Sequence, residues 1–298
     1  YRDRINHWIR TLKEDFYTPA GTLDWEVFKT MEQLSFEEAG ERTYERVDPG
    51  YTWGDTYEYA WFRTKLTLPE ETAGKRIVLN LCSGGESTVF VNGSAFGTYR
   101  ADWVKQPHHF LVDNTLTREA KPGDVFEICM ETYAGHFYAE AQDSGCSTGP
   151  VLPGLYRDEL AEGAKRTLGE GTYGIWDEDA YQLFMDVETL SSLLKTLDED
   201  SLRAARVAEA LEQFTLLVDF EQEKAARSRD YRKARAMLEP VLSAVNGSTM
   251  PVFSAIGNAH LDLAWLWPMA ETYRKTARTF AAQLRLMEEY KDYKFIQS

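Results

Sequence analysis

Hydrophobic residues follow two different spacings along this chain of 298 residues. In segment 4–17, and again from about Asp177 to Asn246, apolar positions recur every three or four residues, which predicts helices. From about Trp25 to Tyr156, short runs rich in aromatic and β-branched residues alternate with glycine-containing turns, which is typical of strands. The pattern therefore predicts a β-rich region followed by a helical one.

Turn and cap signals refine both regions. Asn92-Gly93 lies between two apolar runs and favours a hairpin, because both residues tolerate the positive φ of a type I′ turn. Short strands with tight turns are most simply arranged as an antiparallel β-sandwich. In the helical region, Asp200-Ser201 is a suitable cap for the helix that follows, and Pro240 predicts that the helix over 231–245 ends or kinks. We assign no chemistry to these helices and interpret them as a bridge.

A strand–helix–strand pattern occupies the C-terminal part of the chain. Residues 252–257 are apolar and follow Pro251, which predicts a parallel strand covered on both faces. Residues 293–298 predict the next strand, and residues 271–290 between them predict a helix with one apolar stripe. The stripe consists of Tyr273, Ala277, Phe280, Leu284 and Met287.

His260 and Asp262 stand just beyond the first of these predicted strands. Catalytic groups and ligands gather at the carboxyl ends of parallel strands, and side chains two positions apart in an extended segment share a face. One imidazole and one carboxylate could therefore bind a single metal ion. Taken alone, a His-x-Asp pair is more often a hydrogen-bonded surface pair, so its context decides between the two readings.

That context resembles a known family. Residues 257–268 (GNAHLDLAWLWP), the helix beginning ETYRKTARTF and the ending YKFIQS resemble the opening of the catalytic domain of glycoside hydrolase family 38, the α-mannosidases. The resemblance implies a retaining exo-α-mannosidase with zinc or a similar divalent ion. It implies metal ligation by His260 and Asp262, and a sugar subsite lined by Trp265.

The same resemblance implies that the catalytic residues lie beyond Ser298. A retaining glycosidase uses two carboxylates about 5 Å apart, one as nucleophile and one as acid. The family's nucleophilic Asp, also a metal ligand, and a further His follow later in its catalytic domain. Since two protein ligands of about four leave a weak site, we expect this chain alone to be inactive and to bind zinc poorly or not at all.

A second resemblance concerns the β-rich region. The runs beginning at Trp61, Arg76, Val89 and Gly123 resemble the galactose-binding-like jelly roll that accompanies many glycosidases. Sugar-binding members of that family carry exposed aromatic residues on loops at one end of the sandwich. The candidates here are Trp53, Tyr57, Tyr99 and Trp103, but packing is the favoured interpretation because aromatic residues supply large buried areas.

We therefore predict an α+β multidomain chain with four parts. These are an N-terminal helix and lead-in (1–24), a β-sandwich (25–176), a helical bridge (177–249) and the truncated start of a parallel α/β catalytic domain (250–298).

Composition narrows the partners and the compartment. The net charge of -15 opposes binding of nucleic acid or anionic lipid. No apolar run approaches the roughly 18 residues of a membrane span, and the N-terminus does not resemble a signal peptide. Three cysteines without metal-type spacing predict reduced thiols in a cytoplasmic protein. His108 and His109 would point to opposite faces of a strand, which disfavours a shared metal site. Gly145–Pro150 lacks the lysine of a phosphate-binding loop, which disfavours phosphate binding there.

Three functional hypotheses remain. The first is the N-terminal part of an α-mannosidase that hydrolyses terminal α-mannosides of oligosaccharides. The alternatives are an accessory carbohydrate-binding or assembly module, and another sugar-directed metal hydrolase. Because an opened parallel sheet exposes backbone edges and an apolar face, we expect segment 252–298 to pack onto the helical bridge, to mediate a homo-oligomer or to be partly disordered.

Overall fold

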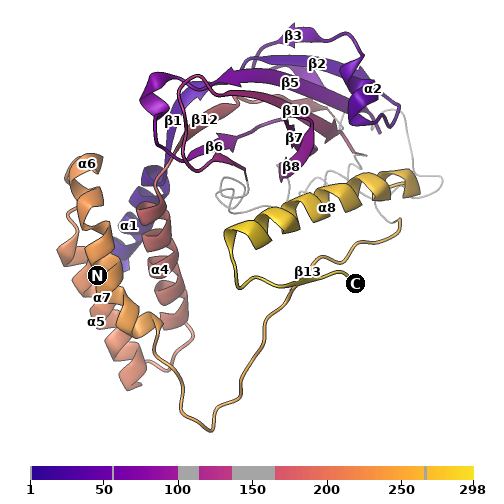
Figure 1. The fold of residues 1–298 in the computed structure, drawn as a ribbon. Helices are drawn as coiled ribbons and strands as arrows, with labels where there is room; N and C mark the ends of the chain where they lie inside the picture. Colours follow the sequence, from indigo (N-terminus) through magenta and orange to yellow (C-terminus); the bar gives the residue numbers. More distant parts are fainter. Residues whose placement is uncertain (1, 56, 100–113, 136–164, 265–266) are drawn as a thin grey trace. The chain divides into compact units, whose positions relative to one another are not determined.

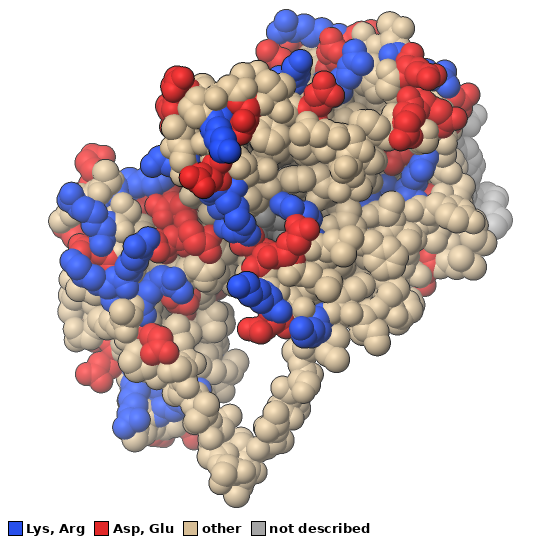
Figure 2. Space-filling model, in the orientation of Figure 1, with Lys and Arg blue, Asp and Glu red and all other residues tan. Residues whose placement is uncertain are grey.

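The computed structural model describes residues 2–55, 57–99, 114–135, 165–264 and 267–298. These residues form two compact units, one comprising Tyr1–Thr18 with Ile175–Ser254 and the other Pro19–Gly174 with Ala255–Ser298. The mixture of sheets and helices confirms the α+β class, while the four-part division stays a prediction (Figure 1). On the face shown in Figure 2, acidic and basic side chains are interspersed.

The first unit is a helical bundle. Its helices are α1 (Arg2–Asp15), α4 (Glu178–Leu194), α5 (Leu202–Leu217), α6 (Lys224–Arg227) and α7 (Tyr231–Leu242), with a 3₁₀ turn at Ser228–Asp230. Ser201 caps α5 by accepting a hydrogen bond from the Ala204 amide, as predicted. Helix α7 includes Pro240 and ends two residues later, short of the predicted Val245. A buried cluster of Asp15, Arg227 and Tyr231 joins α1 to the other helices.

The second unit contains the predicted antiparallel strands. Its six-stranded sheet has the order β3-β2-β5-β10-β7-β8, and a four-stranded sheet has the order β1-β12-β6-β9. The first comprises Glu45–Val47, Trp25–Thr30, Tyr59–Thr67, Val125–Tyr133, Glu86–Val91 and Ser94–Tyr99. The second comprises Tyr17–Thr22, Thr172–Trp176, Ile77–Asn80 and Thr115–Thr117, and a short pair joins β4 (Thr52–Trp53) to β11 (Arg166–Thr167).

The predicted hairpin at Asn92-Gly93 joins β7 to β8. The two residues have φ angles of 50° and 82°, the positive values that a type I′ turn requires. Short helices α2 (Phe36–Gly40) and η1 (Glu70–Thr72) lie between other strands. No helix among the described residues is long and apolar enough to cross a membrane.

Helix α8 (Met269–Glu289) belongs to this second unit and packs against β7 and β8 of the six-stranded sheet. Its predicted stripe is present but exposed: Tyr273 is 76% and Leu284 60% accessible. The buried face instead carries Glu271, Lys275 and Arg278. Within its own unit α8 therefore packs on the sheet, where its charged face finds partners, a contact that the sequence did not predict.

The buried parallel strand predicted at 252–257 is wrong. Val252 and Phe253 are 92% and 88% exposed, and only β13 (Gly257–Asn258) forms a parallel pair, with β14 (Phe295–Ile296). The direction of pairing agrees with the prediction, but the length does not. A two-residue pair is too short to form a strand buried on both faces, although Phe295 of β14 contacts Phe280 of α8 at a ring-centroid distance of 6.5 Å.

Candidate functional site: the His260–Asp262 loop

The candidate metal ligands lie on the loop that follows β13. His260 Nε2 and Asp262 Oδ1 are 3.1 Å apart, with side chains 72% and 38% exposed. The loop is tethered to the neighbouring strand, since Gln297 Nε2 donates to the Ala259 carbonyl (2.7 Å) and Asn258 Nδ2 donates to the Ile296 carbonyl (2.8 Å). The two candidate metal-binding atoms, His260 Nε2 and Asp262 Oδ1, therefore lie close together on a tethered loop at a strand end.

This separation is that of a hydrogen bond between the two side chains, and it is also compatible with ligation of one metal ion. Zinc–nitrogen and zinc–oxygen bonds near 2.1 Å in tetrahedral geometry separate the two donors by about 3.4 Å, close to the observed distance. The imidazole and carboxylate are also ligand types that zinc accepts. In the part of the chain that the structure describes, no group of three or more His, Cys, Asp and Glu side chains could hold a metal ion. Trp265 lies outside the described residues.

The far end of the loop is fixed to the first turns of α8. Thr272 Oγ1 donates to the Leu263 carbonyl and accepts from Trp267 Nε1 at 3.0 Å. The Lys275 ammonium lies 4.3 Å from the Trp267 ring centroid, a cation–π contact. The position of the loop therefore depends on where α8 sits.

Buried charges hold α8 on the sheet. Glu86 of β7 accepts from Lys275 Nζ at 2.6 Å and from Arg278 Nε at 3.1 Å. Arg278 also pairs with Glu271, whose other oxygen accepts from the Tyr59 hydroxyl of β5. Burial alone would lower the pKa of Arg278, but the charges of Glu271 and Glu86 outweigh it and raise that pKa. The guanidinium is therefore charged, and its Nε and Nη2 are paired, while Nη1 has no hydrogen-bond partner among the described residues.

Glu131 of β10 adds a titratable group to the same interface. Its Oε1 lies 3.0 Å from Arg274 Nε without hydrogen-bond geometry, so the contact is one of charge alone. Burial raises the pKa of Glu131 to about 7, against the opposing effect of Arg274 and Arg278. Burial also disfavours the charged form of Lys275, and for this basic group the effect is a lowered pKa.

The aromatic residues proposed for sugar binding divide into packed and undescribed ones. Trp53 is fully buried, and its Nε1 donates to the Ser83 carbonyl at 2.9 Å, so it is a packing residue. Tyr57 and Tyr99 are half-buried, and the Tyr99 hydroxyl lies 3.6 Å from Cys82 Sγ. Trp103, His108-His109 and Gly145–Pro150 lie outside the described residues.

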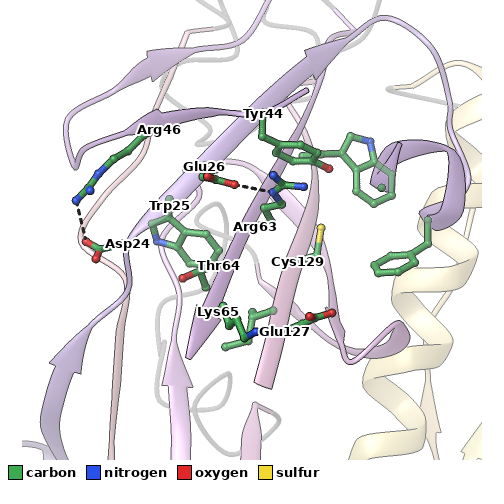
Figure 3. Close-up of a pocket in the computed structure, with 14 residues that line it drawn as sticks. Asp24, Trp25, Glu26, Tyr44, Arg46, Arg63, Thr64, Lys65, Glu127 and Cys129 are labelled. Atoms are coloured by element: carbon green, nitrogen blue, oxygen red, sulfur yellow. Dashed lines mark hydrogen bonds and ion pairs between the residues drawn. The ribbon is translucent and has the colours of Figure 1, made fainter. Parts of the chain in front are cut away.

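Sequence reasoning missed a cavity of about 570 Å³ over strands β2, β5 and β10. Figure 3 shows Glu26 and Arg63 joined across neighbouring strands within it, near Tyr44. Alternation of Trp61, Arg63 and Lys65 along β5 was the available signal, since residues two apart share a face.

Comparison with known proteins finds a similar domain for each of two segments of the chain. Residues 250–298 match the glycosyl hydrolases family 38 N-terminal domain, and residues 21–149 match the α-mannosidase jelly roll domain. Alpha-mannosidase 2C1 of Mus musculus is 26% identical over 90% of this chain and 24% of its own length. Alpha-mannosidase G of Dictyostelium discoideum is 24% identical over 90% of the chain and 23% of its own length.

The chain thus spans about a quarter of the length of these curated relatives. A Ruminococcus gnavus β-glucuronidase structure covers 54% of the chain and 28% of its own, at 15% identity and a TM-score of 0.33, too low to support an inference. The family and domain matches agree with the resemblances in the sequence. The chain is thus similar to glycosyl hydrolases of family 38 over residues 250–298 and to the α-mannosidase jelly roll domain over residues 21–149.

Proposed function

We propose that this chain supplies part of the active site of a retaining, divalent-metal-dependent α-mannosidase that acts on terminal α-mannosides of oligosaccharides. The observation that carries the proposal is the pair His260 and Asp262, whose donor atoms lie 3.1 Å apart on a tethered loop within the segment that matches family 38. The names of the relatives support the substrate class.

In this proposal His260 Nε2 and Asp262 Oδ1 hold zinc or a similar cation, and Trp265 lines the sugar subsite. The bound cation would polarise and orient adjacent sugar hydroxyls. The tethers from Gln297 and Thr272 keep the loop in place for that task. The two carboxylates of the retaining mechanism and the remaining ligands come from other parts of the enzyme, so the chain alone is inactive and binds zinc weakly.

The test is hydrolysis of p-nitrophenyl α-mannoside by the intact gene product that contains this chain. We expect His260→Ala and Asp262→Asn each to lower kcat/KM more than about 100-fold, beyond the 10–100-fold typical of groups that only support a ligand, and to lower bound metal. Asp292→Asn removes an exposed carboxylate from the turn before β14 and should change neither quantity. Activity that survives both loop substitutions and chelation would contradict the proposal.

We propose three further features of the enzyme. Free thiols at Cys82 and Cys129 support a cytoplasmic location. The exposed apolar stripe of α8 supports a homo-oligomer. The cavity over β2, β5 and β10 favours a second function, accessory carbohydrate binding, beside the catalytic one.

A further inference from the structure

The segment between α7 and β13 contains an exposed Asn246-Gly247 pair. Residues 244–256 form neither helix nor strand, and both residues of the pair are exposed (Figure 1). The same dipeptide occurs at Asn92-Gly93, in the hairpin between β7 and β8, and there too both residues are exposed. Each pair is preceded by valine and followed by serine, so the chain presents one tetrapeptide in two different backbone settings.

An asparagine that precedes a glycine can cyclise onto its own backbone. The glycine amide nitrogen loses its proton and attacks the asparagine Cγ, the Cγ–Nδ2 bond breaks, and the nitrogen of the side chain leaves as ammonia. Water then opens one of the two C–N bonds of the cyclic succinimide, which gives aspartate or isoaspartate. The sum consumes one water and releases one ammonia, without an oxidant or a reductant. Glycine favours ring closure because it has no Cβ and its backbone rotates freely.

The reacting atoms at Asn246 are accessible. Neither the Gly247 amide nor Asn246 Nδ2 has a hydrogen-bond partner among the described residues. A Cβ built on Gly247 would meet no atom within 4 Å, so the space beside the attacking nitrogen is open. Arg203 Nη1 of α5 donates to Asn246 Oδ1 at 2.8 Å. This oxygen gains negative charge when the nitrogen attacks, so the guanidinium favours the reaction.

The hairpin holds the same groups in an unreactive arrangement at Asn92. Asn92 Oδ1 accepts from the Glu127 amide at 2.9 Å, and the Asn92 amide donates to the Glu127 carbonyl at 2.8 Å. The turn also fixes φ at 50° for Asn92 and 82° for Gly93. Ring closure at Asn92 therefore requires local opening of the hairpin, although the residue is exposed.

We propose that Asn246 is a site of spontaneous deamidation, which converts it to aspartate and isoaspartate while Asn92 is retained. The new carboxylate keeps Arg203 as a partner, and an exposed pair of this kind adds little to stability, so the helical unit accommodates the product. Isoaspartate carries the backbone through Cβ, which lengthens the segment between α7 and β13 by one methylene. The site shares no residue with the His260–Asp262 loop, so the proposal is independent of the catalytic one.

The test is peptide mapping by mass spectrometry after incubation of the intact gene product in mildly alkaline water enriched in heavy oxygen. The carboxylate formed during incubation takes up heavy oxygen, which separates new conversion from earlier conversion. We expect label at Asn246 at least about tenfold faster than at Asn92, because the two hairpin hydrogen bonds must open first. Isoaspartate should accompany aspartate, because direct hydrolysis of the side-chain amide would give aspartate alone. In denaturant the two asparagines should be labelled at equal rates, because their neighbours are identical.

Two glycine variants test the attacking nitrogen. Gly247→Ala should slow labelling of Asn246 at least about twofold, because alanine restricts the backbone rotation that brings the nitrogen to Cγ. The added methyl group meets no atom within 4 Å, so the fold is kept. Gly40→Ala is the matched control, since its methyl group also meets no atom within 4 Å, and it should leave the rate at Asn246 unchanged. Equal rates at Asn246 and Asn92 in the folded protein, aspartate without isoaspartate, or an unchanged rate in Gly247→Ala would overturn the proposal.

Discussion

Arg278 offers the sharpest test of how α8 is held on the sheet. Its side chain is 4% exposed and pairs with Glu271, which is fully buried, and with Glu86, which is 14% exposed. Arg278→Met preserves much of the aliphatic volume but leaves these carboxylates without the guanidinium. Breaking a buried ion pair by removing one partner costs about 3–5 kcal/mol.

Neighbouring contacts place the expected loss at the lower end of that range. Glu86 keeps Lys275 as a partner at 2.6 Å, and Glu271 keeps the hydrogen bond from Tyr59. We therefore expect a loss of about 3 kcal/mol, which is more than 100-fold in the opening equilibrium of α8. Hydrogen exchange of the α8 backbone amides measures this directly, as a fall in protection of that size.

Two further variants separate charge loss from general damage. Arg232 forms an ion pair of 2.7 Å with Asp179 but is 82% exposed, so Arg232→Met should cost less than about 1 kcal/mol and leave α8 exchange unchanged. Adding Glu271→Gln to Arg278→Met removes the unpaired charge and should restore part of the protection. Protection within threefold of the parent in Arg278→Met alone would refute the reasoning.

Three other predictions follow from the described contacts. In the helical unit, Asp15→Asn should lower the free energy of unfolding by about 3 kcal/mol in urea, because Arg227 Nη2 and Asp15 Oδ1 form a buried pair at 2.6 Å; an unchanged midpoint would contradict this. The pKa of Glu131 is about 7 in the folded protein, against its ordinary value of 4.5. Between these pH values the folded state holds a proton on Glu131 that the unfolded state has released, so the contribution of Glu131 to stability falls as pH rises from about 4.5 to 7. Glu131→Gln should flatten that part of a Tm–pH profile, and identical profiles would exclude Glu131 as the cause. Finally, Leu284→Glu places a charge on the exposed stripe of α8 and should reduce self-association in sedimentation velocity, with Thr276→Glu, on a half-buried position of the same helix, as the comparison.

Local signals predicted the local structure well. The positive-φ turn at Asn92-Gly93, the Ser201 cap and the helical stripes depend on residues close together in sequence, and the structure confirms them. The cavity depends instead on Glu26, Arg63 and Cys129 meeting across three strands. That register is set by non-local pairing, which no single stretch of sequence specifies.

The position of α8 shows why hydrophobic periodicity identified the helix but not its buried face. Glu271, Lys275 and Arg278 follow the spacing i, i+4, i+7, so they form a second stripe beside the apolar one. Periodicity shows that two faces differ, whereas the identity of the buried face depends on what the neighbouring element presents. Here β7 and β10 present Glu86 and Glu131, which select the charged face.

The charged face also specifies the register of α8 in a way that an apolar face would not. A shift of one helical turn would bring Ala282 to the place of Arg278, leaving Glu86 of β7 without that guanidinium and the Tyr59 hydroxyl of β5 without Glu271. Apolar side chains tolerate such shifts better, because methyl groups of similar volume exchange at small cost. Since Lys275 and Thr272 on the same helix contact Trp267 and the Leu263 carbonyl, the register that the jelly roll imposes on α8 also sets the position of the His260–Asp262 loop.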